Sequence, residues 1–121
     1  MGSIMNGNQS SKLAKVDLRS HQYRFVKLGA DDLVDICGVA EQAYGVLLNI
    51  PNIGENAEVA CLGETQVEAV ELIAANVLVA PDADGKAITA TTNDFVRGIC
   101  TKASTGAGMI TIRLMDSYKA L

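Results

Sequence analysis

The chain has 121 residues, of which 49% are hydrophobic and only 4% aromatic, so its apolar content comes mainly from Ala, Val, Leu and Ile. This is the length of one domain, which excludes a large multidomain enzyme. The formal net charge of -4 has the wrong sign for a protein that binds phosphate backbones, so we expect no nucleic-acid partner.

The chain also offers little material for membrane insertion or catalysis. No stretch approaches the roughly 18 consecutive apolar residues of a membrane span, and the N-terminus lacks the apolar segment of a signal peptide. His21 is the one histidine, and the three cysteines form no CxxC pair. A metal site, a disulfide framework and a histidine-centred triad are therefore disfavoured. We expect no enzymatic activity, no cofactor, no metal, no membrane partner and a reducing compartment.

Residues 1–21 are predicted to form a flexible N-terminal arm. A polar tract opens it, and three basic residues against one acidic residue then give it a formal charge of +2, which leaves -6 for the rest of the chain. Apolar residues among basic ones suit a segment that orders as an added strand on a partner's sheet. An ordinary frayed terminus is the alternative. The candidate partner-binding residues are Lys12, Leu13, Lys15, Val16, Leu18 and Arg19.

Residues 22–121 are predicted to form a single β-rich domain. Short apolar runs alternate with turn signals rich in Gly, Asp and Asn, which is typical of strands and hairpins. The expected strands are 23–28, 33–37, 44–49, 57–62, 65–70, 77–80, 87–90, 95–101 and 109–115. Residues 64–76 also have helical propensity, so one short helix stays open there.

The two halves of the chain are related when they are compared without gaps at an offset of 53 residues. This offset pairs Gly45 with Gly98 and Val26 with Val79, and it keeps the order of turns and strands. Neither half has enough chain to bury its apolar face alone. The predicted fold is therefore all-β, a small barrel or sandwich of short strands from two related halves.

Three features resemble chemical motifs but are better explained by structure. Residues 82–85 (DADG) begin like a calcium loop, yet the later ligands are absent, which favours a hairpin turn. The 104–108 loop resembles a phosphate-binding loop but leads into a strand rather than a helix. Cys37, Cys61 and Cys100 lie in or at the ends of apolar strands, where cysteine serves as a small core residue.

Six motifs, taken in order, resemble the capsid decoration proteins of tailed bacteriophages, also called cement or head-stabilising proteins. They are 26–31 (VKLGAD), 43–51 (AYGVLLNIP), 54–63 (GENAEVACLG), 79–87 (VAPDADGKA), 96–100 (VRGIC) and 109–114 (MITIRL). The resemblance covers about residues 23–115, and the order of the motifs carries more weight than any single one. The sequence departs from the family at residues 74–76 (AAN), where the family more often has a glycine.

The resemblance implies a structural protein of the virion that is made in the host cytoplasm and assembles as a homotrimer. It would bind the major capsid protein on the exterior of an icosahedral shell and stabilise the head against the pressure of packaged DNA. One alternative is another virion component, such as the base of a head fibre or a tail protein. A small ligand-binding β-domain that uses loop 82–86 or 104–108 is the other.

Overall fold

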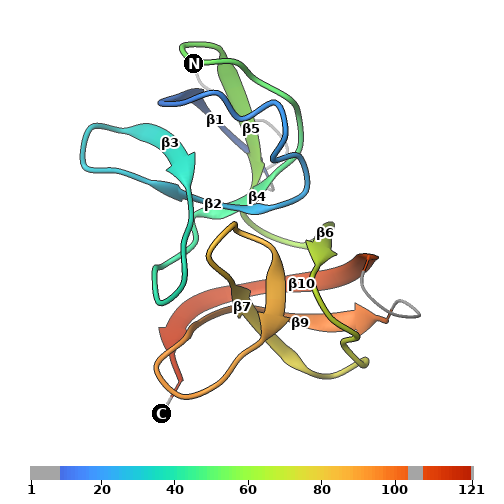
Figure 1. Cartoon of the computed structure of the whole chain (residues 1–121). Helices are drawn as coiled ribbons and strands as arrows, with labels where there is room; N and C mark the ends of the chain where they lie inside the picture. Colours follow the sequence, from blue (N-terminus) through green and yellow to red (C-terminus); the bar gives the residue numbers. More distant parts are fainter. Residues whose placement is uncertain (1–8, 104–107, 121) are drawn as a thin grey trace.

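The computed structural model describes residues 9–103 and 108–120 and confirms the all-β prediction (Figure 1). Ten strands form two closed five-stranded barrels. The first barrel contains β1 (Gln9–Ala14), β2 (Phe25–Leu28), β3 (Leu33–Ile36), β4 (Gly45–Leu47) and β5 (Asn56–Ala60). The second contains β6 (Glu64–Ala69), β7 (Leu78–Pro81), β8 (Ala87–Thr89), β9 (Phe95–Lys102) and β10 (Gly108–Lys119).

The two barrels have the same topology, which confirms the prediction of two related halves. Around the first barrel the strand order is β1-β3-β2-β4-β5, and around the second it is β6-β8-β7-β9-β10. The strand registers also repeat at the offset of 53. Val26 pairs with Ile36 in the first barrel, and the equivalent Val79 pairs with Thr89 in the second.

The first strands of the two barrels, β1 and β6, are equivalent at an offset of 55 residues rather than 53. Lys12 pairs with Ala57 in the first barrel, and Val67 pairs with Ile110 in the second. The link from the first to the second strand is thus two residues longer in the first barrel. A comparison without gaps at 53 does not align β1 with β6.

Backbone geometry repeats between the barrels as well. Residues with positive φ occur at equivalent places: Tyr23 (64°) and Asn76 (72°), Asp32 (66°) and Gly85 (81°), Ala40 (58°) and Asn93 (74°). Asn76 lies in the segment where the resembling family more often has a glycine. Asparagine tolerates the left-handed conformation better than most residues, so the turn survives the departure.

The shared glycines Gly45 and Gly98 mark a close approach of neighbouring strands. A Cβ at Gly45 would lie 2.2 Å from the carbonyl oxygen of Ala60, and one at Gly98 would lie 3.0 Å from that of Arg113. Any side chain at Gly45 would push β4 away from β5. The barrel wall therefore requires glycine there.

All nine expected strands are confirmed, and the open question over residues 64–76 is resolved as strand β6 followed by a turn. The alternative of a short helix does not hold, because β6 pairs with β10 over six residues. Local helix propensity does not include such a long-range interaction.

The prediction of a flexible arm is wrong for residues 9–21. Strand β1 closes the first barrel by pairing in parallel with β3 and antiparallel with β5. Ala14 is 2% exposed and Leu18 is fully buried. Ala14 and Leu18 pack in the core of the first barrel, and Ile73, equivalent to Leu18 at the offset of 55, is likewise buried. Residues 1–8 of the predicted arm lie outside the described residues.

The two barrels share one hydrophobic core. Phe25 and Val46 of the first barrel belong to the same buried cluster as Val67, Ile110 and Ile112 of the second. A smaller cluster inside the first barrel includes Leu18. No helix in the described part of the chain is long and apolar enough to cross a membrane.

Candidate functional site

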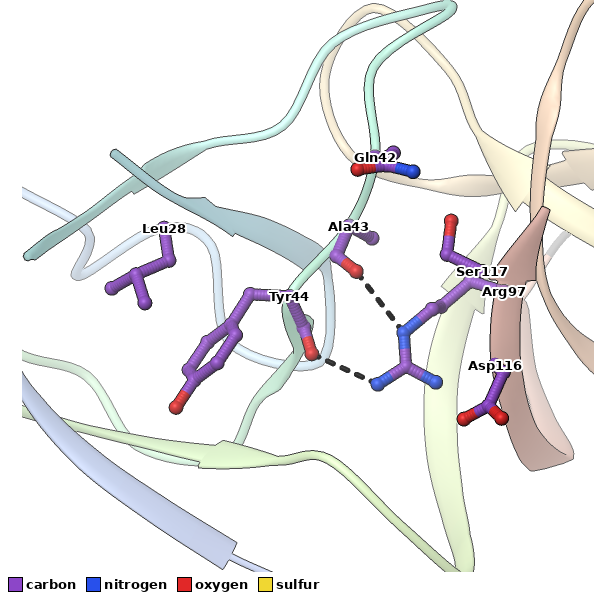
Figure 2. Close-up of a pocket in the computed structure, with 7 residues that line it drawn as sticks. All are labelled: Leu28, Gln42, Ala43, Tyr44, Arg97, Asp116 and Ser117. Carbon is purple, nitrogen blue, oxygen red and sulfur yellow. Dashed lines mark hydrogen bonds between the residues drawn. The ribbon is translucent and has the colours of Figure 1, made fainter. Parts of the chain in front are cut away.

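A buried arginine ties the two barrels together (Figure 2). Arg97, on β9, is 8% exposed and donates only to backbone carbonyls. Its Nε donates to the oxygen of Ala43 (3.0 Å), and its Nη2 donates to those of Tyr44 and Cys61 (2.9 Å each). Its Nη1 donates to the oxygen of Met115. One side chain thus joins the loop before β4, the linker between the barrels and β10.

A β-bulge in β10 accompanies this arrangement. Gly98 pairs with Leu114 and Val96 pairs with Tyr118, so Arg97 alone lies opposite three residues of β10. A bulge bends its strand and changes where backbone groups point. Here the bulged segment includes Met115, whose carbonyl accepts from the guanidinium. The equivalent position in the first barrel holds Tyr44, whose hydroxyl instead bonds Ser10.

A pocket of about 290 Å³ opens beside this guanidinium. Ser117 Oγ is buried there without a hydrogen-bond partner in the described part of the chain. Burial lowers the pKa of Arg97, and Cys61 and Asp116 act in the opposite sense. The lining residues, drawn in Figure 2, are Leu28, Gln42, Ala43, Tyr44, Arg97, Asp116 and Ser117.

The turn between β7 and β8 makes a second contact between the barrels. Phe25 N donates to the carbonyl oxygen of Gly85 (2.7 Å), and Arg24 Nε forms an ion pair with Glu68 Oε1 (3.0 Å). Partial burial acts to raise the pKa of Glu68, but its pairing with Arg24 and Lys86 outweighs burial and leaves that pKa below its ordinary value. The carboxylate therefore stays ionised at this junction.

The two barrels use different surfaces at their junction. Under the 53-residue offset, Gly85 corresponds to Asp32 and Phe25 to Leu78. A two-fold interface would also bring Asp32 to Leu78, but Asp32 is exposed and pairs with Lys12 at 3.0 Å. The junction is therefore head to tail. The equivalent positions that take no part in this junction, Asp32 of the first barrel and Asn76 of the second, are exposed in the described part of the chain.

Replacing Gly85 by alanine is expected to destabilise the chain by about 2–3 kcal/mol, because two costs combine there. Gly85 has a φ of 81°, and an added Cβ would lie 2.5 Å from the carbonyl oxygen of Phe25. Gly54 is a matched control, since its φ is 79° but its Cβ would meet open space. Gly54→Ala should cost only about 1 kcal/mol in urea unfolding. Equal losses in the two variants would contradict the close docking of the turn.

The structure places the predicted partner-binding residues in the first barrel rather than on an arm. Leu18 is fully buried and so is not a surface residue, Val16 is partly buried, and Leu13 is 50% exposed. Whether the exposed members contact a partner stays a prediction. The basic side chains form ion pairs, Lys12 with Asp32 (3.0 Å), Lys15 with Asp31 (3.1 Å) and Arg19 with Asp17 (2.9 Å).

The structure confirms the hairpin interpretation of residues 82–85. Asp82 Oδ1 accepts hydrogen bonds from the backbone N–H groups of Asp84 and Lys86, each at 2.8 Å. The carboxylate thus serves the turn between β7 and β8. Most of the 104–108 loop lies outside the described residues. Cys37 and Cys100 are fully buried in the shared core, as expected, while Cys61 is partly exposed.

Cys37 is expected to resist alkylation in the folded chain. Burial raises its pKa from 9.0 to about 12. Below pH 9 this thiol is neutral in both the folded and the unfolded chain, so its raised pKa does not change stability there. Between pH 9 and 12 only the unfolded chain ionises readily, and the stability of the fold therefore falls as the pH rises. Iodoacetamide at pH 8–10 should therefore label Cys37 only as fast as the chain unfolds. Labelling at the rate of a small thiol peptide would show that Cys37 is not buried.

Sequence reasoning missed Arg97, although one signal was present. A single charged residue interrupts the apolar run of β9, on the strand face opposite to the fully buried Val96 and Cys100. All four acceptors of Arg97 are main-chain carbonyls. Every residue has such a carbonyl, so the sequence does not show which residues would pair with Arg97. The site that results is a contact site between two barrels of the same topology, with a pocket at their junction that Arg97 and Asp116 both line.

Comparisons with known proteins find a likeness in fold. No protein-family model matches the sequence. No curated protein matches it either. The structure is similar to the crystal structure of the N base of head fiber gp8.5 in bacteriophage phi29, with a TM-score of 0.70 and 18% sequence identity. The match covers 93% of this chain and 97% of that one.

Proposed function

We propose that this chain is a structural protein of a phage head that binds the major capsid protein on the outer face of the shell. The observation that carries the proposal is the likeness to a head-fibre base over 97% of that base. The ordered motifs at 26–114, which resemble phage decoration proteins, support it independently. The role is one of contact, without enzymatic activity.

A structural protein on the outer face of the head can take one of two roles. As the base of a head fibre, the form that the structural neighbour favours, the chain would anchor a further structure to the head. As a cement protein, it would itself stabilise the shell. A protein that binds only the mature lattice stabilises that lattice by mass action, and many copies add modest contributions.

A homotrimer is part of the proposal. The head-to-tail junction leaves the equivalent positions, Asp32 and Asn76, exposed among the described residues. Repeating such an interface between chains gives either a closed ring or an open filament. Three chains, each with two barrels, would close a ring of six barrels. In light scattering we expect three times the 12.7 kDa of one chain.

The experiment is co-sedimentation of the purified chain with phage heads, combined with its copy number in whole particles. We expect binding to expanded heads and not to procapsids, in multiples of three. Hundreds of copies per particle would identify a cement protein, and a few dozen would identify a fibre base. Recovery of the chain with purified tails, or no binding to either form of the head, would overturn the proposal.

A further inference from the structure

We infer that the pocket at the barrel junction is a docking site for the carboxylate side chain of an aspartate or glutamate, carried by an extended segment of a protein partner. The identity of that partner as the capsid surface rests on the proposed function. The chemistry of the pocket rests on its own residues, chiefly Arg97 and Ser117.

Two hydrogen-bond donors in the pocket remain for a ligand. A guanidinium has five N–H donors, and four of those of Arg97 are bonded to backbone carbonyls, which leaves one on Nη1. Ser117 Oγ is buried without a partner among the described residues and lines the same pocket. Buried donors usually find an acceptor. A single acceptor group between these two side chains would satisfy both.

The guanidinium of Arg97, rather than the sum of charges in the pocket, favours an anionic acceptor. All four acceptors of Arg97 are neutral carbonyls, and no carboxylate of the described chain lies within ion-pair distance of it. Asp116 lines the pocket, but its side chain is at the exposed surface. The charge of Asp116 reaches Arg97 without forming an ion pair. A nine-tenths buried guanidinium with a free N–H therefore gains from a carboxylate at hydrogen-bond distance, because charge-assisted hydrogen bonds are the stronger kind.

The neighbouring strand favours a polypeptide over a small carboxylate. Pairing of β10 with β6 ends at Arg113, whereas pairing with β9 continues to Lys119. Within the described chain, the end of β10 therefore has a strand on one side only. Ser117 lies in this stretch and lines the pocket. An extended segment that pairs with the open edge can place an acidic side chain beside Arg97.

The direct test uses two peptides and the full chain, without capsids. Acetyl-Gly-Glu-Gly-amide should shift the NMR signals of Arg97 Nε–H and the Ser117 amide, saturating with a Kd of about 1–10 mM that weakens as salt is added. Acetyl-Gly-Gln-Gly-amide should shift them at least fivefold less at equal concentration. Equal shifts with both peptides, or no shift at Arg97, would overturn the inference.

Variants at Ser117 test whether this side chain takes part in binding the peptide. Ser117→Asp places a carboxylate at the position of the buried Ser117 Oγ and should abolish the peptide response without lowering the Tm. Ser117→Ala removes one donor and should weaken the response at least threefold. Ser20→Asp makes the same charge change on an exposed residue and should leave the response intact.

The same variants separate this inference from the proposed function. In co-sedimentation with expanded heads, Ser117→Asp should bind at least tenfold more weakly than the unmodified chain, and Ser20→Asp should bind normally. Normal binding by Ser117→Asp would overturn the pocket inference and leave the capsid role standing. A peptide response in a chain that binds no heads would overturn the capsid role and leave the pocket standing.

Discussion

Replacing Arg97 by methionine is expected to lower the free energy of unfolding by about 3–5 kcal/mol, a large part of the 5–15 kcal/mol of a typical domain. The methionine fills similar space but donates nothing. The carbonyls of Ala43, Tyr44, Cys61 and Met115 would each lose a hydrogen bond at the junction. Unsatisfied buried acceptors cost more than the bonds themselves contribute.

Urea unfolding of three variants measures this effect. Arg113→Met changes an exposed arginine of β10 and should stay within about 0.5 kcal/mol of the unmodified chain. Arg97→Lys keeps the charge but should lose most of the stability, because one ammonium does not reach carbonyls that a planar guanidinium bridges. A loss below 1 kcal/mol for Arg97→Met would show that the junction does not depend on this side chain.

Leu18→Ala is expected to destabilise the chain by about 3–4 kcal/mol. Leu18 is fully buried in the same cluster as Val26, Leu47 and Val59 of the first barrel. Truncation removes its transfer free energy and leaves a cavity that the closed barrel fills only in part. In a flexible arm, the same change would have little effect on unfolding.

The matched control for Leu18 is Leu13, which lies five residues earlier and is 50% exposed. Leu13→Ala should cost about 1 kcal/mol or less. The comparison requires only the midpoints and slopes of two urea curves. If the two variants lost equal stability, residues 9–21 would not be part of the folded barrel.

Much of the fold could be predicted from the residues that form turns and from the similarity between the two halves of the sequence. Strands 25–28 and 78–81 were predictable because apolar runs end in Asp- and Gly-bearing turns at the same offset. Strand β1 was not, since its sequence (QSSKLA) is largely polar and its offset differs from that of the other strands. Its pairing with β5 spans more than forty residues, and no local signal records such a contact.

The candidate site was less predictable than the fold. The basic residues of the N-terminal segment were noticed because they stand out in composition, yet Lys12 and Lys15 pair with the 31–32 turn and Arg19 pairs with Asp17. Arg97 attracted no attention because it is a single charge in an apolar strand. Its partners come from three distant segments that only the packing of one barrel on the other brings together.

We propose that this chain works by contact, as a pair of barrels on the outside of a phage head. Electron cryo-microscopy of intact particles that contain the chain tests this role. We predict density for groups of three copies on the outer capsid face, each group arranged as a ring of six barrels, with the pocket of Arg97 and Ser117 against a segment of the partner. Absence of this density from the head, or its presence only in the tail, would overturn the proposed role.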